Sequence, residues 1–130
     1  MEANYTVTFL KAGTPNNGSG LVFWGKDDND WYEMMTSPNG WFAVEHQLSG
    51  RRLYPVAWYE EGALKKGEGA ENQVKVVTKG NQATIFINGK EVVSFPGQPP
   101  EGGSLIGFAG SSGAAGQNSV AFSNFQVVQP

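Results

Sequence analysis

The sequence predicts an all-β fold in which short antiparallel strands form a sandwich or a barrel. Apolar and polar residues alternate with a period of two through most of the chain, and the spacing typical of amphipathic helices is nearly absent. The 18 glycines and 7 prolines fall at intervals between the alternating segments and not in one tract. About ten short strands separated by turns are the pattern of a β-sandwich or a β-barrel.

In the first half of the chain, turn residues bound each expected strand. Tyr5, Val7 and Phe9 alternate with threonines, which places the three apolar side chains on one face of the first strand. The acidic stretch 25–30 and the SPNG stretch 37–40 are the clearest turns, because Asp, Asn, Pro and Gly favour turn conformations. The strands expected in this half are 4–10, 21–24, 31–36, 41–48 and 52–59.

The second half begins with a polar loop at 60–71, which has room for one helical turn. Two hairpins follow it. The first turns through the KGN stretch 79–81, and the second turns at Asn88 and Gly89, the residue pair that favours a type I′ turn. A Pro/Gly loop and a glycine-rich loop then separate the last two strands. The strands expected in this half are 72–78, 82–87, 90–95, 104–109 and 119–128.

The last expected strand changes its phase part-way along. Val120 and Phe122 alternate, but the next apolar pair, Phe125 and Val127, is out of step with them. An extra residue in one strand of an antiparallel pair shifts the alternation by one position. We therefore expect a β-bulge at 123–124 that returns all four side chains to one apolar face.

Length, charge and cysteine content exclude several classes of protein. A chain of 130 residues suits one domain with a single core, so we expect residues 1–130 to form one β-sandwich domain. The net charge is -3, and the 9 basic residues are scattered, which argues against a nucleic-acid partner. The absence of cysteine excludes disulfides, thiolate zinc sites and cysteine nucleophiles.

The sequence gives no sign of membrane insertion. No apolar run approaches the roughly 20 residues that cross a bilayer. The first residues, MEANYTVTF, have neither the basic start nor the apolar stretch of a signal peptide. Because the chain enters a strand-like pattern at once, we expect it to be a domain excised from a longer protein.

The aromatic residues around the acidic turn give the strongest functional signal. Six apolar residues of neighbouring strands are expected to face the core: Leu21, Phe23, Tyr32, Met34, Phe42 and Val44. Alternation then turns their neighbours to the opposite face of the sheet. Indole rings stack on the apolar side of a pyranose, and carboxylates accept hydrogen bonds from its hydroxyls. The expected ligand-binding residues are Trp24, Trp31, Glu33, Trp41, Glu45, Arg52, Tyr54 and Trp58.

A core role for the tryptophans is the alternative, because a buried Trp is ordinary in a β-sandwich. Four tryptophans lie in the region 24–58. We expect at least one of them, above all Trp58, to serve as a core residue or a loop anchor, so both interpretations stay open at this point.

The acidic turn offers two interpretations of its own. Asp27, Asp28, Asn29 and Asp30 carry the hard oxygen ligands that calcium prefers, but calcium needs about six to eight of them. The glycine and glutamate of an EF-hand loop are not in register here. The simpler interpretation is a solvated hairpin tip. We predict no metal or other cofactor and keep calcium as the alternative.

Catalytic signatures are weak. A glycosidase needs two carboxylates about 5–10 Å apart, and Glu33 has no acidic residue two or four positions further on. Glu45 lies on the next expected strand and could approach Glu33 across an antiparallel pair. His46 has no second histidine and no aspartate at a useful spacing, and the serines lack a Gly-x-Ser-x-Gly motif. We predict that the domain is not an enzyme.

The order of the segments resembles the concanavalin A-like lectin/glucanase sandwich, which is also seen in laminin-G-like modules. The likeness rests on GLVFW before the acidic turn, WYEM after it, NQVKVVTKGNQATIFINGKEV, and the closing GSLIGFAG and VAFSNFQV. The chain is also similar to the 3-keto-disaccharide hydrolase-like domain family. The resemblance implies an antiparallel jelly-roll β-sandwich of two sheets. The paired acidic motif of the glucanases is absent, and so is the family's first strand, which would leave a sheet edge open.

Taken together, these observations favour a non-catalytic binding module for carbohydrate. We expect it to belong to a larger exported protein and to act outside the cytoplasm, secreted or periplasmic. One alternative is a glycoside-cleaving enzyme that uses Glu33 and Glu45. Another is a structural or protein-interaction domain whose exposed apolar face docks a partner. Indoles gathered in solvent would favour the sugar module, and indoles sealed in the core would favour docking.

Overall fold

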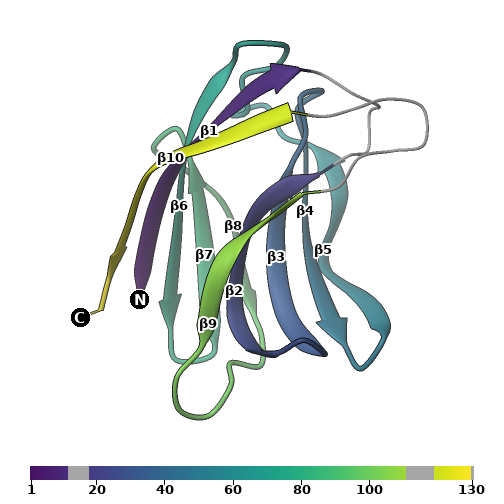
Figure 1. Cartoon of the computed structure of the whole chain (residues 1–130), viewed down its shortest axis with the longest axis vertical. Helices are drawn as coiled ribbons and strands as arrows, with labels where there is room; N and C mark the ends of the chain where they lie inside the picture. The colour runs from purple at the N-terminus through teal and green to yellow at the C-terminus, as the bar shows by residue number, and fades with distance from the viewer. Residues whose placement is uncertain (12–17, 111–118, 130) are drawn as a thin grey trace.

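The structure is a computed structural model that describes residues 1–11, 18–110 and 119–129. This part of the chain forms ten strands and two antiparallel five-stranded sheets that pack face to face (Figure 1). None of the described segments is a helix of the length and apolarity needed to cross a bilayer. The strands are β1 Glu2–Lys11, β2 Ser19–Asp27, β3 Asp30–Thr36, β4 Trp41–Leu48, β5 Arg51–Glu60, β6 Glu71–Lys79, β7 Gln82–Ile87, β8 Lys90–Pro96, β9 Leu105–Gly110 and β10 Ser119–Val128.

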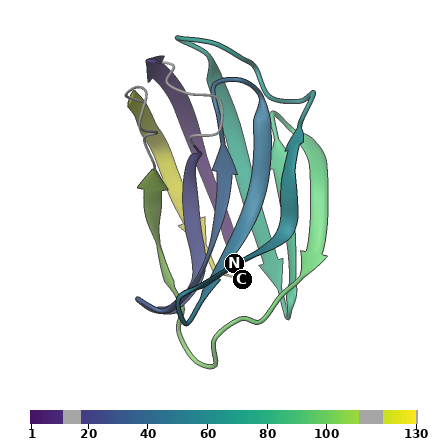
Figure 2. The same ribbon diagram turned by 90° about the vertical axis from the view of Figure 1, so that its right-hand side faces the viewer.

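The strand order confirms the all-β sandwich that the sequence predicts. One sheet, which we call sheet A, has the order β10-β1-β6-β7-β8, and the other, sheet B, has the order β5-β4-β3-β2-β9. The two ends of the chain lie side by side, because β1 pairs with β10 from Glu2 opposite Val128 onward (Figure 2). Consecutive strands β2 to β5 form hairpins within sheet B, and this arrangement presents their outward side chains on one continuous face.

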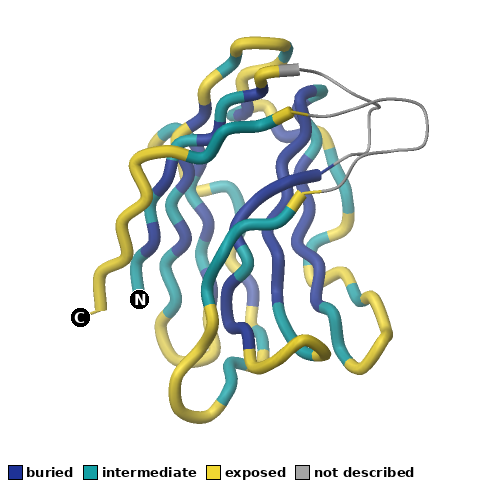
Figure 3. The backbone as a smooth tube through the Cα atoms, in the orientation of Figure 1, coloured by how far each residue is buried: buried dark blue, intermediate teal, exposed yellow. Residues whose placement is uncertain are grey.

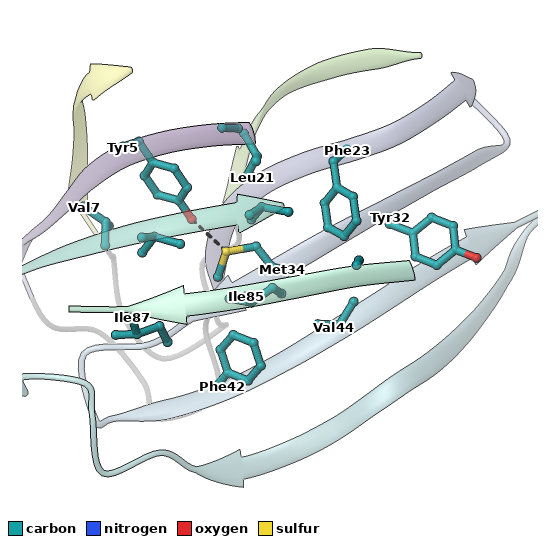
Figure 4. Packing of buried hydrophobic residues seen from close by; sticks show 14 of the residues in the cluster. Tyr5, Val7, Leu21, Phe23, Tyr32, Met34, Phe42, Val44, Ile85 and Ile87 are labelled. Atoms are coloured by element: carbon teal, nitrogen blue, oxygen red, sulfur yellow. Dashed lines mark hydrogen bonds between the residues drawn. The ribbon is translucent and has the colours of Figure 1, made fainter. Parts of the chain in front are cut away.

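The core between the sheets contains the apolar residues that alternation predicts. All six residues expected from the region 21–44 are buried there, together with Tyr5 and Val7 (Figure 4). Phe9 is buried in the same core. The Tyr5 hydroxyl donates a hydrogen bond to Met34 Sδ at 2.9 Å and so ties β1 to β3 across the sandwich. Figure 3 shows the buried positions alternating along the inner strands, while exposed positions gather on the turns and on the end of β10.

The bulge expected in the last strand is present. Asn4 pairs with Gln126 and Thr6 with Ser123, so Tyr5 faces two residues of β10. Asn124 has a φ of 54°, a left-handed conformation that occurs in one class of β-bulge. Strand β10 is the outermost strand of sheet A, so the edge is open in the described chain, as the resemblance implies.

The expected helical turn does not form, because residues 60 and 71 belong to β5 and β6 and residues 61–70 contain turns, bends and irregular backbone. The buried side chain of Asn72 holds this loop instead. Its Oδ1 accepts from the Lys65 amide at 2.8 Å, and its Nδ2 donates to the Lys65 carbonyl at 3.1 Å. A side chain that satisfies both backbone groups of one loop residue removes the need for helical hydrogen bonds there.

Trp24 lies inside the sandwich, and the prediction that it faces the ligand side is wrong. Phe23 pairs with Tyr32, and Asp27 pairs with Asp30. Between these two pairs β2 has two more residues than β3. Within this irregularity Trp24 has a φ of 48°. The consecutive side chains of Phe23 and Trp24 therefore both turn toward the core, where strict alternation would send them to opposite faces.

The Trp24 side chain is almost fully buried and packs against aromatic rings. The indole is 5% exposed and meets the ring of Tyr32 edge-on at a centroid distance of 5.2 Å. Phe95 of β8 lies 6.5 Å away on the other sheet. Gly97 covers the indole from outside, since a Cβ there would lie 2.4 Å from Trp24 Cζ3. Trp24 thus closes one end of the core.

Candidate functional site

Six of the eight expected ligand-binding residues line one pocket on the outer face of sheet B. The pocket, which we call the site pocket, has a volume of about 290 Å³. It gathers side chains from β3, β4 and β5, which are neighbours in the sheet. The six residues are Trp31, Glu33, Glu45, Arg52, Tyr54 and Trp58.

The strand register accounts for this convergence. Glu33 on β3 pairs directly with Glu45 on β4, and Trp31 pairs with Gln47 in the adjacent row. Gln47 pairs in turn with Arg52 on β5. Side chains that are opposite one another on one face of an antiparallel pair stand about 4.5–5.5 Å apart at Cβ. The register therefore brings these residues together without help from a loop.

Two irregularities keep β5 aligned with the site pocket. Val44 pairs with Val56, and the register shifts on both sides of this pair. Val56 packs against the core, whereas Tyr54 and Trp58 line the pocket two residues away on either side. In a regular strand, residues 54, 56 and 58 would share one face. The bulges allow Trp58 to join the pocket, where the sequence also allowed it a core role.

The two carboxylates are buried although they lie on the outer face. Glu33 is 6% exposed and Glu45 is 5% exposed. Arg52 Nε lies 2.9 Å from Glu45 Oε1 and pairs with that carboxylate. Burial, then the nearby charge of Glu45, raise the pKa of Glu33 to about 7, and the Arg52 guanidinium only partly opposes this rise.

Sequence reasoning missed four residues that complete the pocket lining: Gly18, Met35, Gln47 and Gly110. Met35 follows Glu33 by two positions and Gln47 follows Glu45 by two, so extending the same alternation would have found both. The role of Gly18 depends on tertiary contacts, because a Cβ there would lie 2.7 Å from Met35 Cβ and 2.8 Å from Trp58 Cη2. No local pattern reveals such a contact.

Trp41 lies at the start of β4, at an even spacing from Glu45, and is half-buried. It does not line the site pocket. With Trp24 in the core as well, the indoles do not form one continuous row. Two of the four tryptophans, Trp31 and Trp58, contribute to the pocket.

The acidic turn is organised by contacts within the protein. Asp27 Oδ1 accepts from the Asn29 amide at 2.8 Å, which is the local hydrogen bond that Asp makes in turns. Asp30 Oδ1 lies 2.8 Å from His46 Nε2. Among the residues that the structure describes, no group of three or more His, Asp or Glu side chains could hold a metal ion. The contacts favour the hairpin-tip interpretation.

We expect calcium to leave the stability of the protein unchanged. The Asp27 and Asp30 carboxylates already have partners in the chain, so too few ligand oxygens converge for a cation. Thermal unfolding with millimolar calcium and with chelator should give the same Tm for the native protein and for Asp28→Ala. A calcium-dependent rise in Tm that disappears in Asp28→Ala would contradict this expectation.

The expectation that His46 lacks an ordering aspartate is wrong. Asp30 is distant in sequence, but the β3–β4 register places it near His46, and the imidazole also stacks on the Tyr32 ring at 3.9 Å. The Tyr32 hydroxyl accepts from the Gln98 amide at 2.8 Å. These contacts join β3, β4 and the segment after β8 at one end of the sandwich.

A larger hollow lies on the outer face of sheet A, with a volume of about 450 Å³. Its side chains include Asn4, Thr6 and Gln73, with Lys75 held 4.3 Å above the ring of Phe86. It contains none of the expected ligand-binding residues and no carboxylate. The solvated polar side of a sheet accounts for these residues, so the chemically distinctive pocket is the one on sheet B.

Comparison with solved structures identifies the type of fold, whereas comparison of sequences finds no match. No protein-family profile matches the sequence, and no curated protein sequence is significantly similar to it. Solved structures do match. A carbohydrate-binding module, CBM66 from Bacillus subtilis, superposes with a TM-score of 0.73 at 12% identity, over 95% of this chain and 71% of that chain. Sheep galectin-11 superposes with a TM-score of 0.65 at 14% identity, over 93% of this chain and 87% of that chain.

The fold is a lectin-like β-sandwich. At these identities the likeness shows the fold alone. The lectin-like sandwich also matches the GH43 protein BlXynB from Bacillus licheniformis, with a TM-score of 0.64 at 15% identity. The match covers 95% of this chain but 26% of that protein. The narrower similarity to 3-keto-disaccharide hydrolase-like domains and the laminin-G-like likeness stay predictions.

Proposed function

We propose that this lectin-like sandwich is a non-catalytic carbohydrate-binding module and that the site pocket holds the sugar. One observation carries the proposal: aromatic rings and buried carboxylates from three adjacent strands converge in one pocket on a face that would otherwise be solvated. The core of the sandwich does not need these residues. Burial of a carboxylate pair on the outer face costs free energy, and this cost supports a ligand-binding role for the pair.

The lining suits the two sides of a sugar ring. Trp31, Tyr54 and Trp58 supply flat apolar surfaces for the C–H face of a pyranose. The Arg52–Glu45 pair places donors beside an acceptor, which matches a hydroxyl that both donates and accepts. Because the carboxylate and the guanidinium orient one another, little side-chain entropy is lost when the sugar binds.

The size of the pocket favours a short ligand. A volume of about 290 Å³ is at the lower end for small-molecule pockets. Trp24 and Trp41 do not extend it into a long aromatic platform. The pocket therefore suits one or two sugar residues, such as the end of a glycan chain, better than the flat side of a polysaccharide.

The comparisons support this proposal without deciding it. One structural neighbour is described as a carbohydrate-binding module and others as galectins. A glycan ligand would also place the module outside the cytoplasm, in a secreted or periplasmic protein, and this location is part of the proposal.

We expect Trp31→Ala to weaken glycan binding about fivefold, equivalent to about 1 kcal/mol for one lost stacking contact. A glycan array screened with the folded protein, with and without calcium, supplies the probe, and titration calorimetry gives Kd. Phe86→Ala on sheet A is the control and should bind as the native protein does. Trp41→Ala tests whether the binding surface continues along β4.

Equal affinity of the native protein and Trp31→Ala would overturn the assignment of the pocket. Loss of binding in Phe86→Ala alone would move the site to sheet A. An array on which the native protein binds no glycan would overturn the proposed function itself.

Glycoside cleavage by Glu33 and Glu45 stays the alternative prediction. The direct cross-strand pairing of the two residues is the observation in its favour, and the raised pKa of Glu33 suits a general acid. Release of reducing ends from a bound glycan, abolished in Glu33→Gln, would replace binding by cleavage. If the domain is a non-catalytic binding module, the native protein should release no reducing ends.

Docking of a protein partner is the third hypothesis. Exposed apolar side chains lie on the edge strands of both sheets, with Leu105 on β9 and Phe125, Val127 and Val128 on β10. Such residues on open edges are features of interaction surfaces. Within the described chain these positions lie apart from the site pocket, so a partner and a sugar could bind together.

A further inference from the structure

The charges inside the site pocket are unbalanced. Glu33 and Glu45 are directly opposite one another and both are buried, yet one guanidinium serves the two carboxylates. Arg52 Nε is bonded to Glu45, and the Arg52 side chain is 61% exposed. Of the two carboxylates, Glu33 is therefore the one whose negative charge is poorly compensated.

Among the described residues that line the pocket, Arg52 is the one cation near Glu33. The lining residues from β4 and β5 that can carry charge are Glu45, Arg52 and Tyr54. The other edge of the pocket is lined by Gly18, which precedes β2, and by Gly110 of β9. Burial and then the nearby Glu45 charge raise the pKa of Glu33, whereas Arg52 lowers it by less. In the free protein a proton satisfies Glu33 at pH values below about 7.

We propose that the pocket selects a sugar that carries a free amino group and that the ammonium binds at Glu33. The inference rests on the carbohydrate-binding function proposed above. A ligand ammonium beside Glu33 would compensate the negative charge of the Glu33 carboxylate. It would take the place of the proton that Glu33 carries in the free protein. The aromatic rings of Trp31, Tyr54 and Trp58 line the same pocket and add cation–π attraction. A carboxylated sugar would meet two like charges, and an N-acetylated sugar would bring no charge.

If an ammonium replaces the proton on Glu33, binding should release a proton that can be measured. At about pH 6 Glu33 is mostly protonated in the free protein, and an amino sugar is charged. Binding of the ammonium then requires the carboxylate form, so the Glu33 proton leaves to the buffer. Binding should release close to one proton per ligand. A neutral sugar should release none.

The test compares three disaccharides that differ only at C2: β-1,4-linked glucosamine, N-acetylglucosamine and glucose. With the native protein at about pH 6, glucosamine disaccharide should bind about tenfold tighter than glucose disaccharide, as expected for a hydrogen bond to a charged group. In Glu33→Gln the ratio of the two affinities should fall to about one. Glu91→Gln, which removes an exposed carboxylate of sheet A, should keep the tenfold ratio.

The outcomes separate this inference from the function on which it rests. Neutral disaccharides that bind as tightly as the amine, with affinity sensitive to Trp31→Ala, would overturn the inference and leave the carbohydrate site standing. A tenfold ratio that survives in Glu33→Gln would also overturn it. If Glu33→Gln does not fold, calorimetry of the native protein in two buffers of different ionisation enthalpy decides, and zero proton release overturns the inference. Failure of all three disaccharides together with a blank array overturns both proposals.

Discussion

Truncation of Trp24 to alanine is expected to lower the free energy of unfolding by about 3–5 kcal/mol, the range for large aromatic residues removed from a core. The indole is 5% exposed and touches aromatic rings on both sheets, so its loss leaves a cavity at one end of the sandwich. The left-handed backbone at Trp24 and the close backbone of Gly97 should hinder the neighbouring chain from moving in to fill this cavity. A loss of this size is a large fraction of the stability of a domain.

Urea unfolding followed by circular dichroism measures this effect. Trp31→Ala is the matched comparison, because Trp31 is half-buried in the site pocket and its truncation should change stability by about 1 kcal/mol or less. Trp24→Ala should therefore lower mainly the stability, and Trp31→Ala should weaken mainly the binding of glycan. A Trp24→Ala protein as stable as the native one, with weaker glycan binding, would return Trp24 to the ligand side.

Substitution of Glu33 by glutamine is expected to change how stability depends on pH. The pKa of Glu33 is about 7 in the folded protein and near its ordinary value of 4.5 in the unfolded chain, so the folded state binds more protons between these values. The contribution of Glu33 is fully present below about pH 4.5 and is lost as pH rises through about 7. At 1.36 kcal/mol per pKa unit, the native protein loses about 3 kcal/mol relative to Glu33→Gln over this window.

Urea unfolding of both proteins at four pH values from about 4.5 to 8 checks the sign as well as the size. The difference between the two curves cancels the titration of the other carboxylates to a first approximation. Glu91→Gln, an exposed change of equal charge, should give a curve parallel to that of the native protein. Parallel curves for Glu33→Gln and the native protein would contradict the raised pKa of a buried, poorly compensated carboxylate at this position.

Most of the fold follows from the sequence because its strands are regular and its turns are marked. Tyr5, Val7 and Phe9 alternate without interruption, and they are all buried. The phase change between Phe122 and Phe125 correctly indicated a bulge, since an odd shift in a strand has few other causes. The site pocket follows in part for the same reason, as Glu33 and Glu45 share a face through an uninterrupted register.

The rest depends on interactions that a local pattern does not contain. Trp24 turns inward because β2 carries two extra residues opposite β3, and nothing in the letters GLVFWG distinguishes this irregularity from a regular strand. The His46–Asp30 contact arises only once the register of β3 and β4 is fixed. Trp58 reaches the site pocket through two bulges in β5, and alternation alone left its direction open.

The separate settings of the four indoles give the protein an optical readout that needs no label. Trp31 and Trp58 line the site pocket, so a docked sugar should alter their fluorescence. Trp24 is almost fully buried among aromatic rings, so its fluorescence should change mainly on unfolding. Emission at shorter wavelengths, from the buried Trp24, would then report whether the sandwich is folded. Emission at longer wavelengths, from Trp31 and Trp58, would report whether the pocket is occupied. One spectrum could thus report on both processes during a single titration.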